Sequence, residues 1–161
     1  MADQPAGSTA DKDALLRITQ GLRRVDVGTY ALRIRLAEKL GIGTIDINAM
    51  AFVGEVDGLT PKALGNLLNI TTGSVTAMVD RLESKGFMLR RPHPTDRRSV
   101  LLHLSPAGTH AMQWATEHFA DAAAAVLEGS TEDSISDIAS FLEGIGQQLL
   151  AAASEPEQSP S

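Results

Sequence analysis

The residues of this chain with the clearest chemical potential are small hydroxyl side chains in one short segment and the arginines that follow it. A hydroxyl can hydrogen-bond a phosphate or a base edge, and a threonine or alanine methyl can contact a thymine methyl. The candidate contact residues are Thr71, Thr72, Gly73, Ser74, Thr76, Ala77, Arg81, Arg90, Arg91, Arg97 and Arg98. Taken alone, the segment also fits the polar, solvent-facing side of a packed helix.

Positive charge is concentrated around these residues in a chain that is acidic overall. The 161 residues carry a formal net charge of −6. Residues 60–108 hold seven Lys or Arg against three Asp or Glu, a net of +4, whereas residues 109–161 hold nine acids and neither Lys nor Arg. Binding to a polyanion depends on the local field, so the basic middle favours a nucleic acid as the partner. A solvated basic face is the alternative interpretation.

Two short helices with a tight connection are predicted to position the hydroxyl segment. The first spans Pro61–Leu68 and the second about Thr72–Lys85, and leucine, valine and methionine give each an apolar side. Asn69 between them accepts a positive φ at low cost, and Thr71 can cap the second helix. Gly65 is small where the helices would cross. This arrangement is a helix-turn-helix, whose second helix can enter a DNA major groove.

A β-hairpin is predicted directly after the second helix. Its strands are Phe87–Arg91 and Ser99–Leu104, and two prolines stiffen the loop between them. Asp96 is predicted to pair with Arg98 and to orient the tip, from which an arginine could reach a narrow minor groove. The expected fold is therefore mostly α, a winged helix-turn-helix with a small β-hairpin wing. An ordinary charged surface hairpin is the alternative.

Apolar residues recur at helical spacing on both sides of this region, which predicts helices over about residues 11–40, 44–55, 106–128 and 131–153. The long helices are apolar on more than one side, so they are expected to pack on a second copy. The expected organisation is a disordered N-terminus (1–10), N-terminal helices for dimerisation and support (11–56), the winged helix-turn-helix (57–105), C-terminal dimerisation helices (106–153) and a disordered tail (154–161).

Two motifs in the basic region are specific. They are V-x-x-x-V-D-R-L-E-x-x-G-F over Val75–Phe87 and D-R-R-x-V-x-x-x-L-S-x-x-G from Asp96 to Gly108. In these motifs the chain resembles the MarR family of bacterial winged-helix transcription regulators. The resemblance implies a homodimer with interlocking N- and C-terminal helices, which binds a pseudo-palindromic operator in double-stranded DNA and responds to a small ligand or an oxidant. It makes Thr72–Lys85 the recognition helix and aims Arg97 and Arg98 at the minor groove. We expect a repressor, with an activator as the alternative.

The same resemblance implies an effector pocket between the dimerisation helices and the winged domain. The candidate lining residues are Tyr30, Ile45, Phe52, Met112 and Trp114, because rings and methionine suit a small aromatic or phenolic ligand. Ordinary core packing is the alternative for each of them. The chain has no cysteine, so a thiol-based sensor is excluded.

No metal, cofactor or catalytic site is expected. His110, Glu117, His118 and Asp121 lie on one predicted helix, but its two histidines are two turns apart, so solvated histidines are the default. No phosphate loop, H-E-x-x-H, nucleophile elbow or dinucleotide fingerprint occurs, which argues against an enzyme. A winged helix that binds protein instead of DNA stays open as an alternative. The polar N-terminus and the lack of a long apolar run predict a cytoplasmic protein without a membrane partner.

Overall fold

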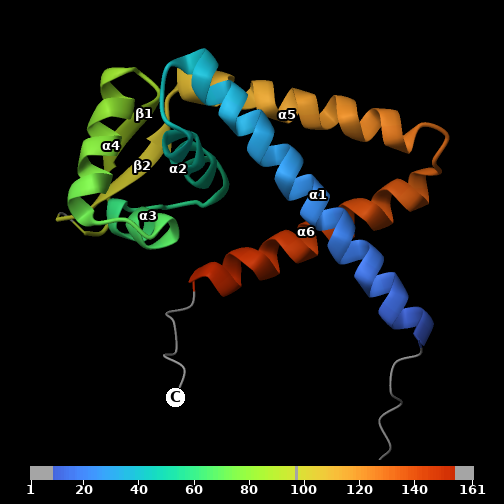
Figure 1. Ribbon diagram of the computed structural model, residues 1–161. Coiled ribbons are helices and arrows are strands. Elements are labelled where there is room, and N and C mark those ends of the chain that lie inside the picture. Colours follow the sequence, from blue (N-terminus) through green and yellow to red (C-terminus); the bar gives the residue numbers. More distant parts are fainter. Residues whose placement is uncertain (1–8, 97, 155–161) are drawn as a thin grey trace, which may run out of the picture. The chain divides into compact units, whose positions relative to one another are not determined.

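The computed structural model describes residues 9–96 and 98–154. Within these residues the chain has six helices and one two-stranded antiparallel sheet (Figure 1). In chain order the elements are α1 (Thr9–Leu40), α2 (Thr44–Glu55), α3 (Pro61–Leu68), α4 (Thr72–Ser84), β1 (Met88–Pro92), β2 (Val100–Leu104), α5 (Pro106–Leu127) and α6 (Glu132–Ser154). The predicted fold, mostly helical with a small hairpin wing, is confirmed.

The chain divides into two compact units between Thr44 and Ile45. The predicted disordered ends, 1–10 and 154–161, lie outside the described residues except for Thr9, Ala10 and Ser154, which extend the terminal helices.

The first unit consists of α1, a single helix of 32 residues. The helix runs without a break through Gly21 and Gly28, although glycine is a poor helix former. Leu15, Val25 and Val27 are each more than half exposed. A helix that leaves aliphatic side chains exposed along its length is suited to packing against a further apolar surface.

The second unit builds its core from α2, α3, α4 and the hairpin, which lie together in Figure 1. The side chains that this core buries most completely are Ile47, Met50, Leu64, Val75, Val79, Leu82, Met88 and Leu102. On α4 the buried positions recur at helical spacing, so one side of this helix is fixed in the core and the opposite side faces solvent.

The turn between α3 and α4 depends on residues with little steric bulk. Asn69 has a φ of 51° and ends α3 in the left-handed region, as its sequence position predicts. A Cβ on Gly65 would lie 3.1 Å from Val75 Cγ2 and 3.3 Å from the Ile70 carbonyl oxygen, which confirms the predicted close crossing. Thr71 caps α4 because its hydroxyl oxygen accepts the main-chain N–H of Ser74 at 3.3 Å.

The wing is the hairpin β1–β2, whose antiparallel register pairs Met88 with Leu104 and Pro92 with Val100. The main-chain N–H of Leu102 also donates to the Leu59 carbonyl oxygen at 2.8 Å, which ties the segment before α3 to the outer side of β2. Strand β1 begins one residue later than predicted, because the Phe87 N–H donates to the Leu82 carbonyl oxygen and completes the end of α4.

The junction between the wing and α5 explains why glycine and serine recur in the two sequence motifs. Gly86 has a φ of 78°, and the hydroxyl of Ser105 donates to its carbonyl oxygen at 2.5 Å. Ser105 also caps α5 by accepting the Gly108 N–H at 3.0 Å. A Cβ on Gly108 would lie only 2.0 Å from the Phe87 carbonyl oxygen, so a side chain there cannot be accommodated without movement.

Helices α5 and α6 are joined through Gly129, which has a φ of 81°. Ala111 and Ala115 near the start of α5 are buried. By contrast, many large apolar residues of the two helices are exposed, namely Phe119, Val126, Ile135, Ile138, Phe141, Leu142, Leu149 and Leu150. In the described part of the chain, each helix is too short or too polar to cross a membrane.

Candidate nucleic-acid interface

The exposed side of α4 gathers the predicted hydroxyl and small residues on one surface. Thr72, Gly73, Ser74, Thr76 and Ala77 are all exposed, whereas the residues between and beyond them on the other side of the helix are buried. The structure thereby brings together the segment that the sequence singled out. This surface, residues 72–77 of α4, is called the α4 face below.

Hydrogen bonds within α4 already use some of these hydroxyl groups. The Thr76 hydroxyl donates to the Thr72 carbonyl oxygen at 3.0 Å, which leaves its methyl group and an acceptor site for a partner. The hydroxyl oxygens of Thr71 and Ser74 lie 2.9 Å apart at the helix cap. Thr71 was predicted as a contact residue, and the structure gives it a capping role first.

Gly73 provides space at the start of the α4 face. A Cβ built on Gly73 meets nothing within 4 Å, in contrast to the Cβ that Gly108 would carry. No atom of the described protein therefore requires a glycine at this position. The lack of a side chain leaves the helix backbone accessible to a partner molecule.

Arg81 is held by two hydrogen bonds to Asp46, a residue of α2. Its Nε donates to Asp46 Oδ2 at 3.1 Å and its Nη2 donates to Oδ1 at 2.5 Å. The Asp46 side chain is 1% exposed and that of Arg81 is 45% exposed. The hydrogen bond with Asp46 raises the pKa of Arg81 above its ordinary value, against a smaller opposing effect of burial. The DNA-contacting role of Arg81 stays a prediction, for a guanidinium that is paired with a buried carboxylate and remains partly exposed.

Arg90 is likewise held by acidic residues, in this case on α4. Its main-chain N–H donates to Glu83 Oε1 at 2.9 Å, its Nη1 donates to Glu83 Oε2, and its Nη2 lies 2.7 Å from Asp80 Oδ1. The contact links β1 to the helix that precedes it. The DNA-contacting role of Arg90 stays a prediction, for a side chain whose charge is already matched by two carboxylates within the protein.

The remaining predicted arginines lie along the wing. Arg91 and Arg98 are exposed, and among the described residues neither guanidinium forms a hydrogen bond or ion pair within the protein. Arg97 lies outside the described residues. Arg91 and Arg98 therefore keep positive charge available on the wing.

Asp96 supports the wing tip through the main chain. Its Oδ1 accepts the main-chain N–H of Arg98 at 2.9 Å, and its carbonyl oxygen accepts the N–H of Ser99 at 3.0 Å. A side-chain ion pair between Asp96 and Arg98 was predicted, whereas the contact that forms fixes the backbone that carries the arginine. The supporting role of Asp96 stands, with a different bond.

Sequence reasoning missed two partners in these contacts, Asp46 and Glu83. Asp46 is fully buried at a position that shares one side of α2 with Ala49, Met50 and Val53. A charged residue on the apolar stripe of a helix indicates a buried ion pair, and this signal was available. Its partner was not, because Arg81 is 35 residues away in the sequence.

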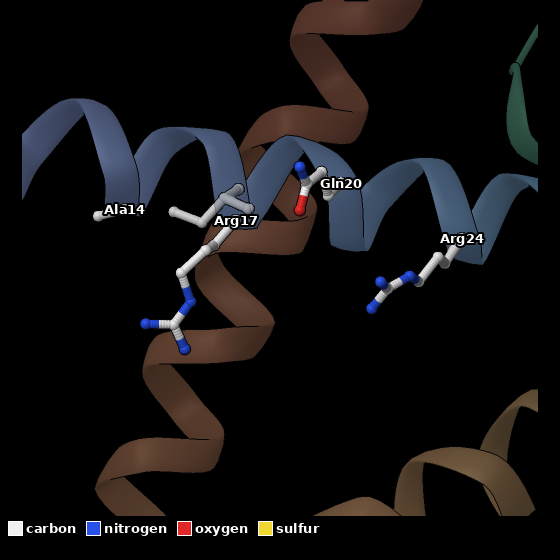
Figure 2. Close-up of a pocket in the computed structure, with 5 residues that line it drawn as sticks. Ala14, Arg17, Gln20 and Arg24 are labelled. Atoms are coloured by element: carbon white, nitrogen blue, oxygen red, sulfur yellow. The ribbon is translucent and has the colours of Figure 1, made fainter.

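The five predicted effector residues differ in their surroundings. Tyr30 and Ile45 are 55% and 40% exposed, whereas Phe52, Met112 and Trp114 are half-buried. A hollow of about 600 Å³ on α1 is lined by Ala14, Arg17, Ile18, Gln20 and Arg24, and a second of about 350 Å³ by Gln20, Arg23, Arg24 and Val27. Figure 2 shows Arg17 and Arg24 projecting from the same side of the helix. Neither hollow includes any of the five predicted residues.

The histidines on α5 have local partners. His118 Nδ1 lies 2.8 Å from the Trp114 carbonyl oxygen, and the two rings are 4.1 Å apart. Over residues 9–96 and 98–154, no three His, Asp or Glu side chains are close enough to hold one metal ion.

The helix-turn-helix, the hairpin that follows it and the α5 junction make this chain a winged helix-turn-helix protein. Residues 49–100 match the model of the MarR family. The chain is 32% identical over 102 residues to the uncharacterized HTH-type transcriptional regulator YcgE of Bacillus subtilis, an alignment that covers 63% of this chain and 64% of YcgE. In this region, residues 49–100, the chain is similar to the MarR family. It spans less than two thirds of the length of this relative.

Solved structures of regulators share this fold. A transcriptional regulator from Thermotoga maritima matches with a TM-score of 0.63 and 20% identity, over 88% of this chain and 99% of the other. A mutant MepR of S. aureus bound to an oligodeoxyribonucleotide matches with a TM-score of 0.54 and 18% identity, over 82% of this chain and 97% of the other. At these identities the likeness describes the fold.

Proposed function

We propose that this protein is a sequence-specific DNA-binding transcription repressor, which acts in the cytoplasm as a homodimer on a pseudo-palindromic operator and responds to a small ligand. One observation carries the proposal. Helix α4 buries one side in the core and presents hydroxyl and small residues on the other, next to a wing with exposed arginines. The relative YcgE is named an HTH-type transcriptional regulator. A MepR mutant with a similar fold has been solved bound to an oligodeoxyribonucleotide.

The α4 face is suited to a major groove. Thr72 and Ser74 lie in the first turn, where free main-chain N–H groups and the helix dipole attract phosphate. The methyl groups of Thr76 and Ala77 can contact thymine methyls one turn later. Residues 72–77 lack the Arg, Asn and Gln side chains that read bases with two hydrogen bonds, so part of the sequence preference comes from DNA shape.

The wing supplies positive charge beside the major groove. Among the described residues, the guanidinium groups of Arg91 and Arg98 form no ion pair within the protein, and Arg97 is assigned to the tip by its place in the sequence. An arginine at a projecting tip is suited to a narrow minor groove. Arg81 and Arg90 act indirectly, because each fixes one element of the DNA-binding unit against its neighbour.

Dimerisation is supported by the apolar residues that one chain leaves exposed. They lie on α5 and α6 and include Phe119, Ile138, Leu142 and Leu149. A contiguous exposed apolar surface of this kind is typical of an interface. A two-fold dimer would place two α4 helices about one DNA turn, roughly 34 Å, apart.

The small aromatic or phenolic effector is proposed to bind near Phe52, Met112 and Trp114, with Ile45 as a further lining residue, whereas Tyr30, in the first unit, stays a prediction from the sequence. The first three are neither fully buried nor fully exposed, so part of each side chain is accessible to a ligand. Quenching of the single tryptophan by added phenolic acids tests this site directly. An unchanged fluorescence spectrum at saturating ligand would contradict it.

Selection of bound fragments from a random pool of duplex oligonucleotides tests the whole proposal. We expect enrichment of an inverted repeat whose half-sites are about 10 base pairs apart from centre to centre. The variant Thr76→Val should enrich a different half-site, whereas Thr29→Val on α1, which removes a similar intrahelical hydrogen bond, should enrich the original one. A pool that shows no enrichment in low salt would contradict DNA recognition and favour a protein partner.

A further inference from the structure

The tip of the wing is closed around the ring of His93. The main-chain N–H of His93 donates to the Ser99 carbonyl oxygen at 3.1 Å, directly beyond the last strand pair, Pro92 with Val100. Within the loop, His93 Nδ1 accepts the main-chain N–H of Thr95 at 3.3 Å and that of Asp96 at 3.1 Å. One imidazole nitrogen thus receives two of the N–H groups that turn the chain toward Arg98.

These contacts favour one tautomer of the ring. A nitrogen that accepts N–H bonds carries no proton of its own, so the turn is suited to a ring with its proton on Nε2. The Thr95 hydroxyl lies 3.4 Å from the same nitrogen and can donate to it in that tautomer. Protonation at Nδ1 would place a third donor against the Thr95 and Asp96 N–H groups. The turn could not keep its geometry, because the acceptor that closes it would be lost.

The flanking residues make the ring position specific. Pro94 restricts His93 to extended backbone angles, and Pro92 ends the strand just before it. Asp96 continues the chain of contacts, because its Oδ1 accepts the Arg98 N–H at 2.9 Å. The ring therefore supports Asp96, and Asp96 supports the backbone of Arg98.

We propose that His93 is the positioning residue of the wing, and that its neutral ring is required to present Arg98 to DNA. The inference rests on the proposed function. It goes beyond that function by making DNA affinity depend on the protonation of one side chain. Among the described residues, the charged groups of the turn around His93 are Asp96 and Arg98, and Arg91 lies at the end of β1.

The sign of the pH effect separates this role from simple electrostatics. Protonation adds positive charge near DNA, so electrostatic attraction alone predicts tighter binding in acid. A ring that must be neutral predicts weaker binding. Between pH 8 and pH 5.5, we expect the wild-type affinity for the selected operator to fall about fivefold to tenfold, the range of one or two lost hydrogen bonds.

Three variants make the test specific. His93→Asn keeps an acceptor at the same bond distance from Cα and does not titrate, so it should bind at pH 8 like the wild type and lose little affinity at pH 5.5. His93→Gln places its acceptor one bond further out, and His93→Ala has none, so both should bind at pH 8 as weakly as the wild type does at pH 5.5. Because His103, His110 and His118 remain in all of them, their contribution is the same throughout.

Two results would overturn the role of His93. One is wild-type binding that tightens or stays constant in acid. The other is a His93→Asn variant that is as sensitive to pH as the wild type. The tautomer is tested without DNA, by ¹⁵N chemical shifts of the imidazole, which should show a protonated Nε2 and an unprotonated Nδ1 at pH 8. If the wild type bound no duplex at either pH, the proposed function would fail, whereas a wrong tautomer would refute the closed turn alone.

Discussion

The carboxylate of Asp46 on α2 and the guanidinium of Arg81 on α4 are joined by two hydrogen bonds, of 2.5 and 3.1 Å, across 35 residues of sequence. Asp46 is fully buried, and Arg81 is half exposed. A pair of this geometry fixes both the distance between the two helices and the rotation of α4 about its axis. The direction in which the α4 face points is therefore set in part by a residue outside the helix-turn-helix.

Removing Arg81 from this pair should lower the stability of the fold more than removing Asp46. Arg81→Met leaves a buried carboxylate without its cation and should lower the free energy of unfolding by about 3 kcal/mol. Asp46→Asn should cost less, about 1 kcal/mol, because the half-exposed guanidinium can be hydrated. Urea denaturation measures both, and Arg91→Met serves as the control with a change within about 0.5 kcal/mol.

Two further observations would check the pair. The double variant should lose less stability than the two single losses added together, since both remove the same contact. The pKa of Arg81 is raised, so the contribution of the contact is fully present below the ordinary arginine value and is lost only at more alkaline pH. The cost of Arg81→Met should therefore be the same at pH 7 and pH 9.5. Additive losses, or a cost that disappears at pH 9.5, would contradict this description.

Because Glu83 contacts Arg90, we expect its removal to weaken DNA binding, whereas the loss of a negative charge alone would strengthen it. Glu83→Ala deletes a negative charge from the DNA-binding unit, which on electrostatic grounds should strengthen binding. It also releases β1 from α4, so we expect the operator affinity to fall about threefold to tenfold, the effect of losing one or two charge-assisted hydrogen bonds. Asp57→Asn, which removes an exposed charge from a turn, is the matched control. Fluorescence anisotropy with a labelled duplex decides between the two signs.

Arg98 at the wing tip should contribute to affinity for every sequence. Arg98→Ala removes one exposed cation, and we expect it to weaken binding to operator and random DNA alike and to lower the slope of log affinity against log salt by about 1. Lys12→Ala, which removes a cation from the start of α1, should leave the slope unchanged. An equal slope for Arg98→Ala and the wild type would exclude the wing tip from the interface.

We expect substitution by alanine to have opposite effects on the free energy of unfolding at Gly108 and at Gly73. Gly108→Ala would place a Cβ 2.0 Å from the Phe87 carbonyl oxygen and should lower the free energy of unfolding by about 3 kcal/mol. Gly73→Ala meets nothing within 4 Å, so it should raise that free energy by up to about 1 kcal/mol through better helix propensity, while it weakens operator binding. Thermal unfolding and anisotropy measure the two properties separately. If Gly73→Ala bound the operator as tightly as the wild type, close approach of the α4 backbone to DNA would be refuted.

The elements with local signals could be predicted from the sequence almost to the residue. Helices α2 and α3 begin and end where predicted, because Thr60 with Pro61 and the left-handed Asn69 act within a few residues of the chain. The start of β1 was one residue early, since Phe87 gives its N–H to the end of α4 and its carbonyl oxygen to Ser105. The first of these bonds is local and accompanies the left-handed Gly86, whereas the second joins distant residues and has no local pattern.

The candidate site was predictable in its composition but not in its internal contacts. The α4 face and the wing arginines follow from residue type and helical spacing. The sequence does not show which of these arginines are paired within the protein. Arg81 and Arg90 differ from Arg91 and Arg98 only in the carboxylates that folding brings near them. The same holds for His93, whose role depends on two N–H groups that meet its ring in the closed turn.

The claim on which the function depends is that two copies of the chain present two α4 faces and two wings to one duplex. Sedimentation of the protein with its selected operator, repeated over a series of salt concentrations, tests it most directly. We predict a complex of two chains on one duplex, with a log affinity that falls linearly as log salt rises. A monomer on the duplex, or an affinity that does not change with salt, would contradict it.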